Sequence, residues 1–102
     1  MIRRAKAEWT GVVLVCGKCS KKVGGGFGPK GRTPLAKVLR KLIGGKGRKA
    51  PLGVIETRCL KLCPRNAVTL VDTARPGEWL VVSPGEPVAE IAMRLGRGTP
   101  QA

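Results

Sequence analysis

Four cysteines that fall in two close pairs are the residues of this chain best suited to chemistry. Two residues separate Cys16 from Cys19, and three residues separate Cys59 from Cys63. Because the chain contains no histidine, a metal site here would consist of thiolates, the ligands that suit zinc or an iron–sulfur cluster. Cys16, Cys19, Cys59 and Cys63 are therefore the candidate metal and cofactor ligands.

The interpretation of such cysteine pairs depends on whether the protein is in a reducing or an oxidising compartment. The longest apolar run, 12–16, is far too short to cross a bilayer, and the basic amino terminus lacks the longer apolar region of a secretory signal. We therefore expect a cytoplasmic protein that does not bind a membrane. In a reducing cytosol, paired cysteines are more often metal ligands or redox thiols than structural disulfides.

The length of 102 residues corresponds to a single domain. Its core is expected over about 9–95, preceded by a basic N-terminal segment, 1–8, and followed by a tail, 96–102. Gly96 is expected to end the last helix.

The chain is strongly basic, with 20 Lys and Arg residues against 6 Asp and Glu residues and a formal net charge of +14. Such a surface attracts acidic protein patches or polyanions and accelerates encounter with them. A highly charged, solvated surface without a specific anionic partner explains the same composition equally well.

Apolar patterning places the cysteines at the ends of predicted strands. Runs rich in β-branched residues predict strands over 8–15, 54–59, 68–71 and 78–82, the last two forming a hairpin around a turn with Asp72 and Pro76. Helical periodicity predicts a helix over 34–43, capped by Thr33, and a closing helix that follows a capping box at Ser83. The segment 20–32 is predicted to be a flexible loop anchored by Phe27.

The predicted order is strand, helix, strand, strand, strand, helix. A helical crossover makes the first two strands parallel, and the hairpin adds antiparallel strands to the same sheet. The fold class is therefore α/β with a four-stranded mixed sheet on which the helices pack. Both cysteine pairs follow the carboxyl ends of the parallel strands, so the two pairs are expected to meet at one edge.

Three segments of the chain resemble the thioredoxin-like [2Fe–2S] ferredoxins, a family related to the small thioredoxin-like subunit of respiratory NADH dehydrogenase. The resemblance is strongest over 13–16, over 57–68 and at Glu78 and Trp79, and it extends from about 9 to 95. The second cysteine pair, followed by Pro64 and by Asn66, Ala67 and Val68, is the specific part. Many members of the family space the first two cysteines more widely than this chain does.

The resemblance implies a thioredoxin-like ferredoxin fold in which Cys16, Cys19, Cys59 and Cys63 hold a [2Fe–2S] cluster. The protein would then be an electron carrier and not an enzyme, with acidic redox proteins as partners. Because members of the family pair as dimers, the resemblance also raises the expectation of a homodimer.

The chemistry of a two-iron cluster agrees with two cysteine pairs, since each iron takes two thiolates. The simplest assignment places Cys16 and Cys19 on one iron and Cys59 and Cys63 on the other. Backbone amides and cations near the sulfurs would raise the reduction potential. The candidates for this role are Gly17, Lys18, Lys21, Lys22 and Lys61.

A structural zinc ion in a zinc-ribbon-like site of four cysteines is the first alternative, and the basic surface would then serve a module that binds nucleic acid. Zinc ribbons are built from hairpin knuckles, whereas these pairs follow strands joined by a helix. Aromatic platforms for nucleic acid are also few: Trp9, Phe27 and Trp79 are the aromatic residues of the chain.

Thiol–disulfide exchange at Cys16 and Cys19 is the second alternative, with Lys18 helping to stabilise a thiolate. In thioredoxins the active pair opens a helix, whose N-terminus lowers the thiol pKa. Because the residues 20–32 separate Cys19 from the predicted helix, and because the second pair would have no role, this alternative is disfavoured.

Overall fold

The computed structural model describes residues 1–62 and 64–95. In chain order the elements are β1 (Val12–Cys16), α1 (Gly17–Lys22), α2 (Leu35–Ile43), a single 3-10 turn η1 (Gly47–Lys49), β2 (Gly53–Thr57), β3 (Val68–Asp72), β4 (Leu80–Val82) and α3 (Val88–Arg94). The predicted order is present, with α1 as an additional short helix between the first strand and the predicted crossover helix.

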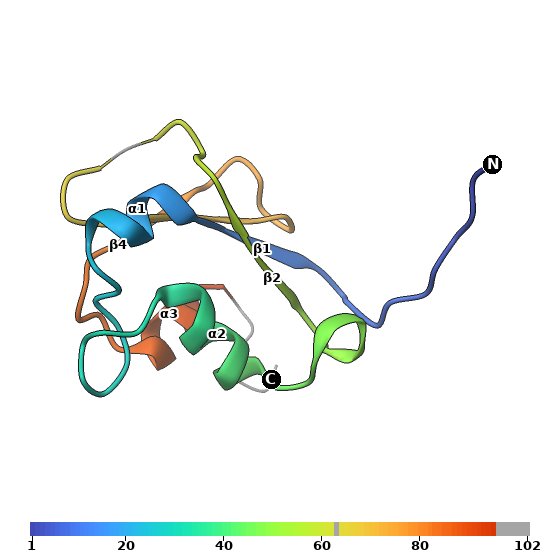
Figure 1. Ribbon diagram of the computed structural model, residues 1–102, viewed down its shortest axis with the longest axis horizontal. Helices are drawn as coiled ribbons and strands as arrows, with labels where there is room; N and C mark the ends of the chain where they lie inside the picture. The colour runs from blue at the N-terminus through green and yellow to red at the C-terminus, as the bar shows by residue number, and fades with distance from the viewer. Residues whose placement is uncertain (63, 96–102) are drawn as a thin grey trace.

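The four strands form one open mixed sheet with the order β2-β1-β3-β4. β1 and β2 are parallel, in a register that pairs Val12 with Gly53 and Cys16 with Thr57. β3 is antiparallel to β1, and β4 is antiparallel to β3. The structure is thus a small α/β protein with a four-stranded mixed sheet and three α-helices, and α2 and α3 lie together on one side of the sheet (Figure 1).

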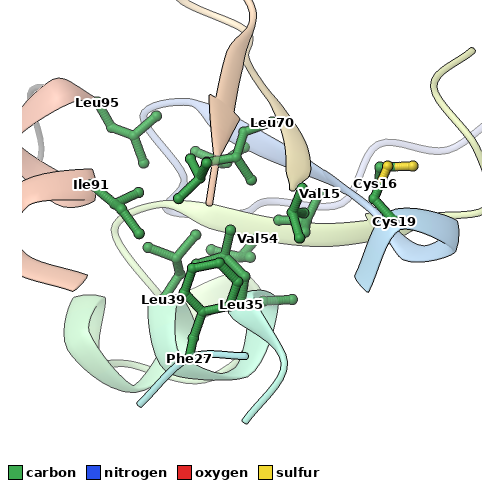
Figure 2. Close-up of a cluster of buried hydrophobic side chains, with 14 of the residues drawn as sticks. Val15, Cys16, Cys19, Phe27, Leu35, Leu39, Val54, Leu70, Ile91 and Leu95 are labelled. Carbon is green, nitrogen blue, oxygen red and sulfur yellow. The ribbon is translucent and has the colours of Figure 1, made fainter. Parts of the chain in front are cut away.

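Alternate residues of the strands face these helices because successive side chains of a strand point to opposite faces. Figure 2 shows the resulting cluster, in which strand residues meet α2, α3 and the ring of Phe27. Its most deeply buried members are Val13, Val15, Cys16, Phe27, Leu35, Leu39, Val68 and Leu70. Each large apolar side chain buried in this way stabilises the fold by about 1.5–3 kcal/mol relative to exposure to water.

The loop before α2 has the anchor that the sequence predicts. Phe27 is 1% exposed, and its backbone N–H and carbonyl bond to those of Thr33 at 3.1 and 2.9 Å. The prediction that the loop begins at residue 20 is wrong, since 20–22 belong to α1. The helix was missed because its six residues are too short for an apolar period to emerge.

The first strand begins at Val12 and not at residue 8 as predicted. The preceding residues run alongside the segment before β2: the Glu8 N–H donates to the Arg48 carbonyl oxygen at 2.7 Å, and the Thr10 N–H donates to that of Pro51 at 2.9 Å. The other strands differ from prediction by one or two residues at their ends. Asp72, predicted in the turn, is the buried last residue of β3.

The two longer helices begin after prolines. Pro34 is the N-cap of α2 and not its first residue, and Gly44 ends the helix with a φ of 82°, which glycine adopts without strain. The capping box predicted at Ser83 is wrong: α3 begins after Pro87, because a proline has no N–H to donate within the helix and disfavours helical backbone in the residue before it. Gly96, the predicted end of this helix, and the rest of the tail lie outside the described residues.

Among residues 1–62 and 64–95, no helix combines the length and the apolar character needed to cross a bilayer.

Candidate functional site

Cys16 lies at the junction of the sheet and a helix. It is the last residue of β1, fully buried, and the N-cap of α1, which begins at Gly17. A side chain on Gly17 would overlap the carbonyl oxygen of Thr57, the last residue of β2. The close approach of α1 to the end of β2 therefore requires glycine at position 17.

Cys19 lies in the first turn of α1 and is 2% exposed. Its thiol lies near enough to that of Cys16 for the charge on one sulfur to affect the other. Figure 2 shows the two side chains close together beyond the end of β1. The structure therefore joins the first predicted pair into one buried dithiol, and both of its cysteines are free thiols.

The segment 58–62 covers this dithiol. The Lys18 N–H donates to the Arg58 carbonyl oxygen at 2.9 Å, and the Leu60 N–H lies near enough to the Cys16 sulfur to affect its ionisation. The carbonyl oxygen of Leu62 lies 3.8 Å from the sulfur of Cys19. The parallel pairing of β1 and β2 thus brings the segment that carries Cys59 next to the first pair.

Cys59 is half-buried within this segment, and its sulfur accepts a hydrogen bond from the Lys61 N–H at 3.4 Å. Lys61 has a φ of 71°, a left-handed conformation that turns the chain sharply after Cys59. Cys63 lies outside the described residues. In the part of the chain that the structure describes, no group of three or more Cys, Asp or Glu side chains is arranged to hold a metal ion.

The surroundings of Cys16 favour its thiolate. Burial raises the pKa of the Cys16 thiol, but the nearby backbone N–H groups of Cys19 and Leu60, together with the Cys19 thiol, favour the thiolate by more and hold this pKa below the usual value. A buried sulfur near several N–H groups is suited to carry negative charge, either as a metal ligand or as a nucleophile.

The surroundings of Cys19 keep it protonated. Burial raises the pKa of Cys19, and the neighbouring Cys16 thiol and the charge on that sulfur raise it further, against a smaller opposing effect of Thr69. The hydrogen bond of the Cys19 thiol to the Leu62 carbonyl oxygen, at 3.8 Å between the heavy atoms, also requires the proton.

The start of α1 removes one argument against thiol–disulfide exchange. That argument depends on the absence of a helix directly after the first pair. In the structure α1 begins at Gly17, so the pair does open a helix.

Positive charge surrounds the candidate site. The segments 17–22 and 56–65 contain six Lys and Arg residues and one carboxylate, Glu56. All six cations are exposed. They are Lys18, Lys21, Lys22, Arg58, Lys61 and Arg65.

Sequence reasoning missed two residues that contact the dithiol. Leu60 contributes through its backbone, for which a sequence carries no signal. Thr69 is fully buried in β3 and donates its hydroxyl to the Leu62 carbonyl oxygen at 3.1 Å, which fixes the segment over Cys19. A lone hydroxyl within the apolar run 67–71 was a detectable sign of this role.

Comparisons of the chain with protein families, with curated proteins and with solved structures gave no match.

Proposed function

We propose that this protein is a one-electron carrier of thioredoxin-like ferredoxin fold that binds a [2Fe–2S] cluster through Cys16, Cys19, Cys59 and Cys63. The observation that supports this most strongly is the contact of the segment 58–62 with both sulfurs of the first pair. The segment that carries Cys59 thereby lies at the same edge of the sheet as Cys16 and Cys19.

By residue type the four donors fit the cluster, although the described Cys16, Cys19 and Cys59 do not form a group that could hold a metal ion. A two-iron centre takes four thiolates, and bound thiolates are stabilised by N–H groups near the sulfurs. Leu60 has such a group near Cys16, and Lys61 donates one to Cys59. When bound, the cluster would accept and release single electrons. Completing the site requires Cys59, with Cys63, to face the buried dithiol.

The cations around the site support an acidic redox protein as the partner. Six exposed Lys and Arg side chains against one carboxylate give this edge a strong positive potential. Such a potential steers an acidic surface toward the edge that carries the cysteines, which is where electron transfer requires contact.

The visible spectrum and metal content of anaerobically purified protein test this proposal. Brown protein with about two irons and two sulfides per chain supports it. Colourless protein with about one zinc ion per chain would replace the cluster with a structural site of four cysteines. Protein that binds neither metal would contradict both assignments.

A second candidate function is thiol–disulfide exchange, and the start of α1 directly after Cys16 favours it. Because Cys16 is fully buried, the segment 58–62 would first have to move away. The Cys16 thiolate would then attack a substrate disulfide and form a mixed disulfide as one substrate thiolate leaves. Cys19, on losing its proton, would attack the Cys16 sulfur, so that the second substrate thiolate leaves and a Cys16–Cys19 disulfide remains. The substrate disulfide gains the two electrons that the dithiol loses.

Position 59 separates the two candidates. The variant Cys59→Ser should lose the cluster, because it removes one of the four ligands. It should retain thiol–disulfide exchange with a small aromatic disulfide, because Cys16 and Cys19 remain. If metal-free protein showed exchange activity that is lost without Cys16 and kept without Cys59, thiol–disulfide exchange would be the favoured function.

A further inference from the structure

A second site lies at the far end of the parallel strands from the cysteines. A pocket of about 390 Å³ opens between the C-terminal end of α2, the loop 44–47 and the start of β2. In Figure 1 this region surrounds the turn η1, on the opposite side of the molecule from α1. Its walls comprise three cations, three loop glycines and a largely apolar part. These are Arg40, Lys41 and Lys46; Gly44, Gly45 and Gly47; and Trp9, Ile43, Ala50, Leu52, Gly53 and Val54.

The charged residues of this pocket are all cations. Arg40 is held in place because its Nε and Nη2 atoms donate to the Val54 carbonyl oxygen at 3.1 and 3.0 Å. The remaining N–H groups of the guanidinium are free to bind a ligand. Lys41 and Lys46 are exposed, and no carboxylate is among the residues that line the pocket. Three positive charges without a counter-ion favour an anionic ligand.

The loop adds backbone donors to these cations. Gly44, Gly45 and Gly47 have φ values of 82°, 76° and 51°, which a residue with a side chain adopts only under strain. In the described part of the chain the N–H groups of Gly45, Lys46 and Gly47 donate to no protein acceptor. Unpaired N–H groups of a glycine-rich turn are common ligands of phosphate oxygens.

The remaining walls are apolar and rigid. The indole Nε1 of Trp9 donates to the Gly47 carbonyl oxygen at 2.7 Å, and its ring lies so close over Gly53 that a side chain there would overlap it. Ile43 and Leu52 complete this wall. A ligand that matches both halves of the pocket carries a phosphate and a flat or apolar organic part.

We propose that this pocket binds a small organic phosphate. Arg40, Lys41, Lys46 and the free N–H groups of the loop would hold the phosphate, and Trp9 with the apolar wall would hold the organic part. The site is independent of the cysteines, so its occupancy does not depend on the proposed cluster.

Isothermal titration with AMP tests the proposal on the full-length protein at physiological salt. We expect saturable binding of one AMP per chain, with binding of adenosine and of inorganic phosphate each at least about tenfold weaker, because each lacks one of the two parts. Binding of a single-stranded oligonucleotide without measurable binding of AMP would overturn the proposal in favour of a nucleic-acid surface. Absence of AMP binding up to millimolar concentration would also overturn it.

Variants decide whether binding occurs in this pocket. Lys41→Ala and Lys46→Ala should each weaken AMP binding about tenfold, the effect of removing one charged donor. Lys37→Ala is the matched control, since Lys37 is an exposed cation of α2 outside the pocket. It should bind AMP as the parent protein does. Equal weakening by all three variants would show a non-specific effect of net charge and would contradict the proposal. Unchanged thermal unfolding confirms that each variant is folded.

Discussion

The backbone N–H of Lys18, in the first turn of α1, donates a hydrogen bond to the carbonyl oxygen of Arg58, just beyond the end of β2, at 2.9 Å. This bond ties the segment that carries Cys59 to the helix that carries Cys19. It also connects the fold to the proposed chemistry, because the parallel pairing of β1 and β2 is what brings the donor and the acceptor together.

Gly17→Ala should disrupt the site. A side chain at this position overlaps the Thr57 carbonyl oxygen, so α1 or β2 must shift at a cost of about 1–3 kcal/mol. Urea unfolding measures the loss of stability, and the visible spectrum measures the loss of bound cluster. Gly77→Ala is the control, because a side chain there meets no atom within 4 Å. Equal stability of the two variants would contradict the packing described at Gly17.

Leu39→Ala should destabilise the protein by about 2–5 kcal/mol, because Leu39 is fully buried and the substitution leaves a cavity in the core. Leu42→Ala, on the same helix, should cost far less, since Leu42 is 48% exposed. The free energy of unfolding in urea gives both values. Similar losses for the two variants would mean that α2 presents a different face to the sheet.

Lys61→Ala should retain the cluster and lower its reduction potential. The substitution removes a positive charge near Cys59 and keeps the backbone N–H that bonds to the Cys59 sulfur. A spectroscopic redox titration measures the potential, and Lys37→Ala, on α2, serves as the control with the same change in net charge. A potential that rises, or that shifts equally in both variants, would rule out a local effect of Lys61.

The pH dependence of the thiols tests the surroundings of Cys16 and Cys19 in reduced, metal-free protein. Because the pKa of Cys16 is lowered and that of Cys19 is raised, Cys16 should ionise first as the pH increases. Ultraviolet absorbance of thiolates follows this titration. Cys19→Ala should move the first ionisation to higher pH, since it removes a thiol that favours the Cys16 thiolate. Cys59→Ala should leave it in place, because the described contacts of the Cys59 sulfur are with Lys61. If the Cys16→Ser variant showed the same first ionisation, the assignment of that ionisation to Cys16 would be refuted.

Much of the fold could be predicted from the sequence. The strands and α2 carry clear apolar periods, and the crossover rule then fixes β1 and β2 as parallel neighbours. That pairing predicted the approach of the segment 58–62 to the first cysteine pair. The start of α3 was misjudged because a proline at position 84 looked like a first helical residue, while Pro87 sets the actual boundary.

Details of the site could not be predicted because they depend on tertiary contacts. The sequence of α1 has glycine and three lysines and no apolar period, so only its packing against β1, β2 and β3 reveals it. The effect of Leu60 on Cys16 comes from a backbone N–H, a group that every residue except proline has. The pocket beside Trp9 forms from segments whose contact requires the complete sheet.

Electron paramagnetic resonance of anaerobically purified, dithionite-reduced protein, with iron and sulfide measured on the same sample, tests the central claim most directly. A [2Fe–2S] cluster held by the two cysteine pairs predicts about one unpaired electron per two irons, and loss of this signal in Cys16→Ser and Cys59→Ser. Reduced protein that contains no iron and sulfide, or a signal that survives both substitutions, would contradict the claim.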